Sequence, residues 1–154
     1  MRMVFGGAPV IDATKDQVWR SLLDPQFVGS TATAIESVEE IDATHFTVVA
    51  GLGIGSLKLR FKLTVELFDI VTGVSAKMRA RGKAPGSTLD VVTTFQLEEL
   101  EPKKIKLVWE ALSDVGGTIA SVGARLLEGT SRRLAEEFWQ DFAAKVSAEA
   151  MSGR

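Results

Sequence analysis

The stretch LKLRFKLTVEL, residues 57–67, alternates apolar and polar side chains from its first position to its last. Leucine, phenylalanine and valine occupy the odd-numbered positions, while charged residues and one threonine occupy the even-numbered ones. Because successive side chains of a strand point to opposite faces, this period of two predicts a strand with one buried and one solvated face.

The same alternation recurs on both sides of this stretch. Short strands are expected at residues 2–11, 35–41 and 45–52. Three further inward-facing rows follow, formed by Val74, Ala76, Met78 and Ala80, by Leu89, Val91, Thr93, Phe95 and Leu97, and by Ile105, Leu107, Trp109 and Ala111. Short connections such as Pro85-Gly86 join successive strands, so we predict a curved antiparallel sheet of about six to seven strands.

Helical signals lie on both sides of the strand region. Thr14 and Gln17 have the spacing of a capping box, and the helix that they begin should end before Pro25, so short helices are expected after the first strand. Residues 115–146 predict a long helix that covers the apolar face of the sheet, which makes the fold class α+β. Its expected buried stripe is Ile119, Val122, Leu126, Thr130, Leu134, Phe138 and Phe142.

Two glycines, Gly123 and Gly129, fall inside this predicted helix. Each should cost a helix roughly 0.5–1 kcal/mol relative to alanine. One interpretation is that small residues let the helix backbone approach the sheet closely. The other is that the thin first half of the helix leaves a hollow beneath it.

The composition sets outer bounds on function. A chain of 154 residues with 45% hydrophobic and 25% charged residues is expected to form one domain, residues 1–154. A net charge of −2 argues against a nucleic-acid binder, and the absence of cysteine excludes disulfides and thiolate chemistry. No secretory leader and no run of about 18 apolar residues is present, so we expect a soluble, cytoplasmic protein.

The inward-facing rows contain no Asp, Glu, Lys or Arg, and the chain has no tyrosine and one histidine, His45. General acid–base catalysis needs a positioned titratable group, so no catalytic residue and no metal site is predicted. An apolar ligand site needs only a concave apolar lining and a few polar groups, among which Thr93 is the one inner-row hydroxyl. The predicted lining is Leu59, Phe61, Leu63, Met78, Thr93, Phe95, Trp109, Ile119, Val122, Gly123 and Leu126. The alternative for each of these residues is an ordinary place in a filled core.

The outward face of two adjacent predicted strands carries a concentration of positive charge. We call this set the basic patch: Lys58, Arg60, Lys62, Lys77, Arg79 and Arg81. Like charges on neighbouring strands repel one another, so the basic patch predicts contact with an anionic partner, either an acidic protein face or anionic lipid. The alternative is a solvated face that keeps the sheet soluble.

Three stretches together carry a family resemblance: ATKDQVWRSLLDP (13–25), IGSLKLRFKLTVEL (54–67) and VGGTIASVGARLLEGTSRRLAEEF (115–138). In order and spacing they resemble the carbon monoxide dehydrogenase CoxG family of the START-like (SRPBCC, Bet v 1-like) superfamily. The residues that match the most specific motif are Gly116, Gly117, Gly123, Arg125, Leu126, Gly129 and Phe138. Two features depart from the pattern: Thr33-Ala34 stands where the family usually has Pro-Gly, and the chain ends AEAMSGR without the apolar anchor of longer members.

The resemblance implies a helix-grip fold with a deep apolar cavity between the sheet and the long helix. It also implies an accessory protein of a CO dehydrogenase-type molybdenum hydroxylase, with peripheral contact at the inner membrane face and no covalent cofactor. The predicted function is a non-catalytic carrier of an isoprenoid quinone or a similar hydrophobic molecule. A cavity enzyme of the cyclase or hydrolase kind, and a docking module without a ligand, remain the alternatives.

Overall fold

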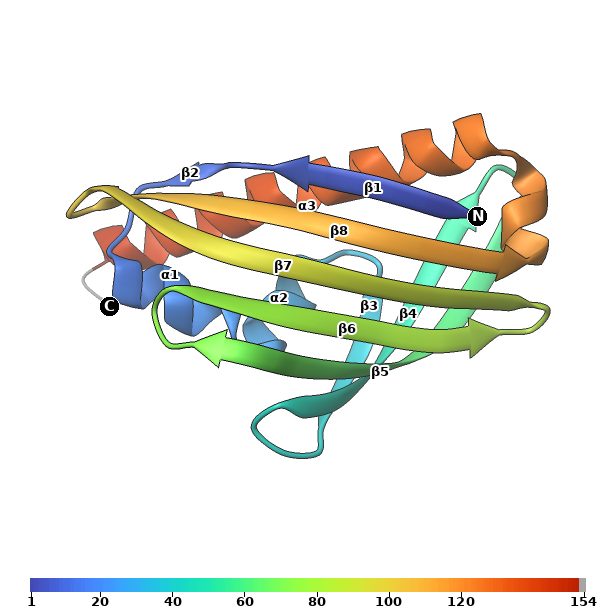
Figure 1. Cartoon of the computed structure of the whole chain (residues 1–154), viewed down its shortest axis with the longest axis horizontal. Helices are drawn as coiled ribbons and strands as arrows, with labels where there is room; N and C mark the ends of the chain where they lie inside the picture. Colours follow the sequence, from blue (N-terminus) through green and yellow to red (C-terminus); the bar gives the residue numbers. More distant parts are fainter. Residues whose placement is uncertain (153–154) are drawn as a thin grey trace.

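The strands form one open, curved antiparallel sheet, and the long helix α3 runs along it (Figure 1). The computed structural model describes residues 1–152. The strand order is β1-β8-β7-β6-β5-β4-β3, with β2 paired to β8. The strands are β1 (Arg2–Gly7), β2 (Val10–Ile11), β3 (Ile35–Glu40), β4 (His45–Ile54), β5 (Leu57–Val71), β6 (Ser75–Ala84), β7 (Ser87–Glu101) and β8 (Lys104–Gly117).

The predicted α+β helix-grip arrangement is confirmed, with eight strands instead of six to seven. The difference arises at Pro9, which lies between β1 and β2. Both pieces pair with β8, so one predicted strand is two. In the middle of β5 the predicted alternation holds, because Phe61, Leu63 and Val65 are buried while the intervening residues are exposed.

Two short helices follow β2, as expected. Helix α1 (Lys15–Leu22) begins with the complete capping box of Thr14 and Gln17, in which each side chain accepts a hydrogen bond from the other residue's backbone N–H. Helix α2 (Pro25–Thr31) begins one residue after the Asp24 carboxylate, which accepts hydrogen bonds from the backbone of Gln26 and Phe27.

The end of the chain departs from the predicted helix over 115–146. Strand β8 continues to Gly117, a 3₁₀ turn η1 (Thr118–Val122) follows, and α3 (Ala124–Met151) begins only after Gly123. Gly123 has a φ of +100°, a conformation that residues with a side chain rarely adopt. It is therefore the break between η1 and α3, not an interior helix residue.

This break changes which face of α3 is buried. The nearly or fully buried residues are Leu127, Trp139, Phe142 and Val146, whereas Leu126 is 45% exposed. The predicted stripe carried one α-helical period through residues 119–122. A 3₁₀ turn has fewer residues per turn, so the predicted face was wrong over the first half of the helix.

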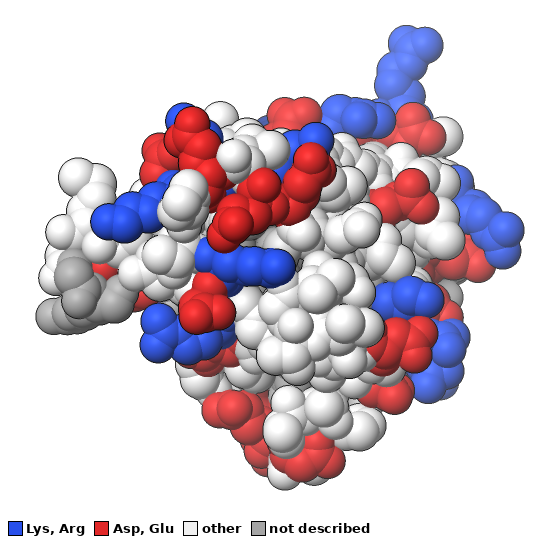
Figure 2. Space-filling model, turned by 60° about the vertical axis from the view of Figure 1, so that its left-hand side comes forward, with Lys and Arg blue, Asp and Glu red and all other residues white. Residues whose placement is uncertain are grey.

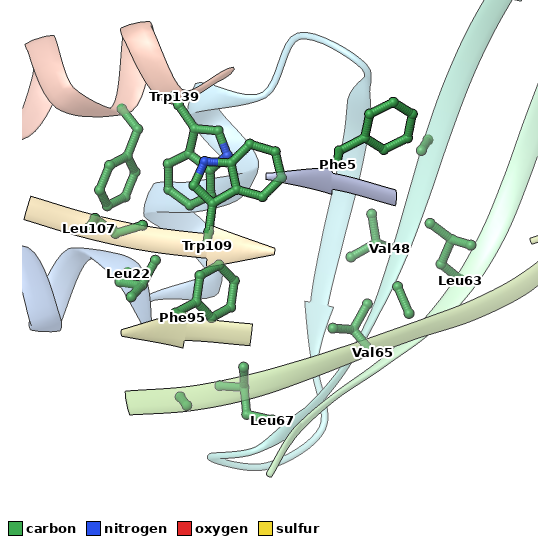
Figure 3. Close-up of a cluster of buried hydrophobic side chains, with 14 of the residues drawn as sticks. Phe5, Leu22, Val48, Leu63, Val65, Leu67, Phe95, Leu107, Trp109 and Trp139 are labelled. Atoms are coloured by element: carbon green, nitrogen blue, oxygen red, sulfur yellow. The ribbon is translucent and has the colours of Figure 1, made fainter. Parts of the chain in front are cut away.

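The core lies between the inner face of the sheet and α3, and its densest part is aromatic. The rings of Trp109 and Trp139 are stacked with centroids 5.6 Å apart, and Phe95 meets Trp139 edge-on at 6.0 Å (Figure 3). Phe138 and Phe142 extend this cluster along α3. The aromatic cluster thus joins β7 and β8 to the middle of the helix.

Candidate functional site

A cavity of about 370 Å³ lies between the inner face of the sheet, helix α2 and the middle of α3. Five strands supply its floor: Phe46, Val48 and Ala50 of β4, Leu63, Val65 and Leu67 of β5, Met78 and Ala80 of β6, Thr93 and Phe95 of β7, and Trp109 and Ala111 of β8. Residues 22–35, which include α2, supply a second wall through Leu22, Leu23, Pro25, Val28, Thr31, Ala32, Thr33, Ala34 and Ile35. Helix α3 closes the third side with Leu134, Ala135, Glu137, Phe138, Trp139 and Asp141.

Small side chains on the sheet explain why this part of the interior is hollow. The strand register places Ala111 opposite Thr93, and Thr93 opposite Met78. In the adjacent row Ala80 lies opposite Val65. Three neighbouring strands therefore present short side chains to the same region, and nothing from α3 fills the space that they leave.

Large side chains flank this hollow on two sides. Trp109 and Phe95 lie on one side beneath Trp139, while Val48, Leu63 and Val65 of β4 and β5 lie on the other (Figure 3). Every residue of the floor is apolar except Thr93. The floor therefore suits a hydrophobic molecule and offers it one hydroxyl.

That hydroxyl is available to a ligand. Thr93 is 7% exposed, and its side chain makes no hydrogen bond with any residue of the described part of the chain. By contrast, the Thr31 hydroxyl, in the α2 wall, donates a hydrogen bond to the carbonyl oxygen of Phe27 at 2.8 Å. A buried hydroxyl without a partner is costly, so Thr93 is the point where a ligand would gain most from a polar atom.

Charge reaches the cavity only at its rim on α3. Glu137 and Asp141 lie one helical turn apart, both are exposed, and neither forms an ion pair within residues 1–152. One turn further along, the ammonium group of Lys145 points toward α2 instead. It donates to Ser30 Oγ at 2.6 Å and lies 4.5 Å from the ring centre of Phe27.

The structure brings together five of the predicted lining residues and leaves six elsewhere. Leu63, Met78, Thr93, Phe95 and Trp109 line the cavity, whereas Leu59, Phe61, Ile119, Val122, Gly123 and Leu126 do not. Phe61 is fully buried in the core, and Ile119 is buried in η1, where its N–H donates to Ser87 Oγ. Val122, Gly123 and Leu126 border a shallow surface groove with Arg125 and Arg133.

The hollow therefore lies beneath the second half of α3, not beneath the first half as predicted. Sequence reasoning missed the alanines of the floor and all of the α2 wall. A usable signal was present, since Ala50, Ala80 and Ala111 are small residues at inward-facing strand positions. Thr33 and Ala34, which depart from the family pattern, both lie in the wall.

Half of the basic patch is already paired with carboxylates. Arg60 meets Glu36 at 2.6 Å, Lys77 meets Asp69 at 3.2 Å, and Arg79 binds both carboxylate oxygens of Asp90 at 2.8 and 3.1 Å. The hydrogen bonds from Arg79 hold the pKa of Asp90 below its usual value. On the face shown in Figure 2, acidic and basic side chains are intermingled around an uncharged area.

His45 lies at the turn between β3 and β4, with its Nδ1 3.0 Å from a carboxylate oxygen of Asp42. Hydrogen bonds from the backbone of Thr44 and from the His45 ring lower the pKa of Asp42 to about 2. In residues 1–152 no three histidine or acidic side chains gather into a group that could hold a metal ion. None of the helices described is both long and apolar enough to span a bilayer.

Comparison with known proteins places the chain among helix-grip proteins. The model of a family described as the G-type subunit of carbon monoxide dehydrogenase (CoxG) matches residues 7–147. A search of curated proteins found no significant match.

Three solved structures share the fold over almost the whole chain. A conserved protein from Geobacillus kaustophilus superposes with a TM-score of 0.87 and 20% identity, covering 95% of this chain and 96% of its own. The ZhuI aromatase/cyclase from Streptomyces sp. R1128 gives a TM-score of 0.71 and 13% identity, covering 95% and 94%. A START superfamily protein from Mycobacterium smegmatis gives 0.63 and 11%, covering 98% and 99%.

Proposed function

This chain belongs to the carbon monoxide dehydrogenase CoxG family, and on that premise we propose that it is a non-catalytic carrier of an isoprenoid quinone or a similar elongated hydrophobic molecule. In this proposal the carrier serves a CO dehydrogenase-type molybdenum hydroxylase, whose own redox centres pass electrons to the bound quinone. The protein acts in the cytoplasm, with peripheral contact at the inner membrane face.

The single observation that carries the proposal is the apolar cavity with one unpartnered hydroxyl on its floor. Its volume of about 370 Å³ lies within the range of pockets that hold small organic molecules. Burial of each methylene group contributes about 0.8 kcal/mol, so a hydrocarbon tail along Val48, Leu63 and Val65 would supply most of the affinity. A quinone carbonyl oxygen could then accept a hydrogen bond from the hydroxyl of Thr93.

A cavity enzyme is the competing function, because the fold is shared with a protein named as an aromatase/cyclase. Shared fold does not transfer chemistry, so the decision rests on the site. The floor offers no histidine, lysine, arginine or carboxylate, and the only titratable side chains of the lining are Glu137 and Asp141 at the exposed rim. This lining supports holding a molecule better than it supports proton transfer.

Docking to the partner enzyme would use the part of the basic patch that is free of ion pairs. Lys58, Lys62 and Arg81 form no salt bridge within residues 1–152, and Lys62 lies opposite Lys83 in the strand register. Repulsion between such neighbours is relieved when an acidic protein surface approaches. We therefore propose these three cations as the contact points.

The carrier function is tested by titrating the protein with decylubiquinone while following tryptophan fluorescence, since Trp109 and Trp139 line the cavity. We expect saturable quenching with one quinone per chain. Replacement of Thr93 by Val should weaken binding about two- to tenfold, the effect of one hydrogen bond of roughly 0.5–1.5 kcal/mol.

The matched control is Thr94→Val, the same change at the exposed neighbour on the other face of β7. It should leave the titration unchanged. Absence of saturable quenching in the unaltered protein, together with no quinone in lipid extracts of protein purified from its native host, would refute the carrier function.

A further inference from the structure

The charge distribution around the cavity defines which hydrophobic molecules can enter it. The floor is uncharged, the α2 wall is uncharged, and the only ionisable side chains of the lining are the carboxylates of Glu137 and Asp141 on α3. Both are exposed at the rim, and no cation within residues 1–152 forms an ion pair with either of them.

We propose that Glu137 and Asp141 make the cavity selective for amphiphiles with an uncharged head and reject fatty-acid carboxylates and phosphate-bearing lipids. This inference rests on the proposed carrier function, because it specifies the class of molecule that the same cavity holds. It assigns the two acidic side chains a role in ligand discrimination.

An anionic head finds no favourable position in this site. Placed on the floor, it would lose its hydration without meeting any lysine or arginine, and an unpaired buried charge is strongly unfavourable. Placed at the rim, it would lie beside two carboxylates of the same sign. A head without charge is not repelled at the rim, and one polar atom of it can meet the hydroxyl of Thr93.

The nearest basic side chain on α3 does not cancel this effect. Lys145 lies four residues after Asp141, yet its ammonium group donates hydrogen bonds to Ser30 Oγ at 2.6 Å and Thr31 Oγ1 at 3.3 Å on α2. It also lies over the ring of Phe27. Lys145 is thus committed to the contact between α2 and α3, and the rim keeps the negative sign of Glu137 and Asp141.

The test compares 1-decanol with decanoate, two ligands of equal chain length that differ in the charge of the head. Each is used to displace the uncharged fluorescent probe N-phenyl-1-naphthylamine from the full-length protein at pH 7.5 and low salt. Decanol partitions better than decanoate into any apolar site, so the informative quantity is how the ratio of their affinities responds to the rim.

In the double variant Glu137→Gln/Asp141→Asn, we expect decanoate to bind about five- to tenfold more tightly while decanol binding stays the same. The control is Glu128→Gln/Glu136→Gln, an equal change in net charge at two exposed positions of α3 outside the cavity lining. Its decanol-to-decanoate ratio should equal that of the unaltered protein. Added salt should narrow the ratio in the unaltered protein more than in the rim variant.

The outcomes separate the two proposals. If neither the probe nor decanol binds, the carrier function is wrong and the inference falls with it. If decanol binds but the rim variant leaves the affinity ratio unchanged, the carrier function stands and the selectivity inference is overturned. Tighter binding of decanoate than of decanol to the unaltered protein would also overturn it.

Discussion

The two halves of α3 differ sharply in what they carry. The first half, residues 124–133, has one buried side chain, Leu127, and a glycine, Gly129, whose missing side chain faces open space. The second half carries Trp139, Phe142 and Val146, all buried, and the rings of the aromatic cluster. The cavity nevertheless lies beneath the bulky half.

The difference teaches that a hollow depends on both of its walls. At the end of the sheet from which α3 begins, Ile54, Val115 and Ile119 are almost fully buried and fill the interior themselves (Figure 1). Farther along, the sheet presents Ala80 and Ala111, and even large rings on the helix do not reach across. The size of the sheet residues, not of the helix residues, sets the position of the space.

The largest effect should come from the one anchor of the thin half. We expect Leu127→Ala to lower the free energy of unfolding by about 2–5 kcal/mol, because a leucine that is 2% exposed leaves a cavity when it is truncated. The adjacent change Leu126→Ala should cost less than about 0.5 kcal/mol, since surface substitutions are mild. Urea denaturation of both variants decides this, and equal losses would contradict the face assigned to α3.

Filling the hollow from the sheet should remove ligand binding. We expect Ala111→Leu to weaken decylubiquinone binding tenfold or more, about 1.4 kcal/mol, because the added atoms occupy the floor. Ala144→Leu, the same change at an exposed position of α3, should leave binding unchanged. Fluorescence titration is the measurement, and full affinity in Ala111→Leu would place the binding site elsewhere.

The thin half should accept a side chain at no cost. No atom outside the local helix backbone lies within 4 Å of a Cβ built on Gly129, so Gly129→Ala should raise the free energy of unfolding by about 0.5–1 kcal/mol. Quinone affinity should stay the same, because this position lies outside the cavity. A destabilised variant, or one with altered affinity, would show that this half of α3 packs against something that the structure does not place there.

The smallest effect concerns a turn remote from both halves. Because the pKa of Asp42 is lowered from 3.8 to about 2 in the folded chain, its carboxylate stabilises the fold above pH 4, and this contribution is lost as the pH falls toward 2. In Asp42→Asn, the unfolding free energy should therefore depend less steeply on pH between 4 and 2. Denaturation series at several pH values measure this, and an unchanged slope would contradict the role of the turn.

The strand pattern was predictable because a period of two depends only on neighbouring residues. The inward position of Phe61, Leu63 and Val65 and the cap at Thr14 needed no knowledge of the rest of the chain. The face of α3 was not predictable in this way. It depends on the backbone conformation of Gly123, which resets the helical period and which no spacing of apolar residues reveals.

The position of the cavity was harder to predict for a related reason. Ala80 and Ala111 lie on strands that are not adjacent, and only the register through β7 brings them near one another. The wall formed by α2 depends on contacts between that helix and β3 and α3, which connect distant parts of the sequence. The kind of site could therefore be inferred from composition, while its location required the assembled sheet.

The attachment of α2 determines how a guest molecule can be exchanged. This seven-residue helix is fastened to α3 by the ammonium group of Lys145 and by the edge of Phe27 against Phe142, whereas the strands around it are hydrogen-bonded from β1 to β3. Passage between the two helices separates one lysine contact and one pair of rings, and every rung of the ladder stays closed. Loading and unloading are then movements of a small hinged flap, and their speed can be adjusted without loosening the curved shell that protects the cargo.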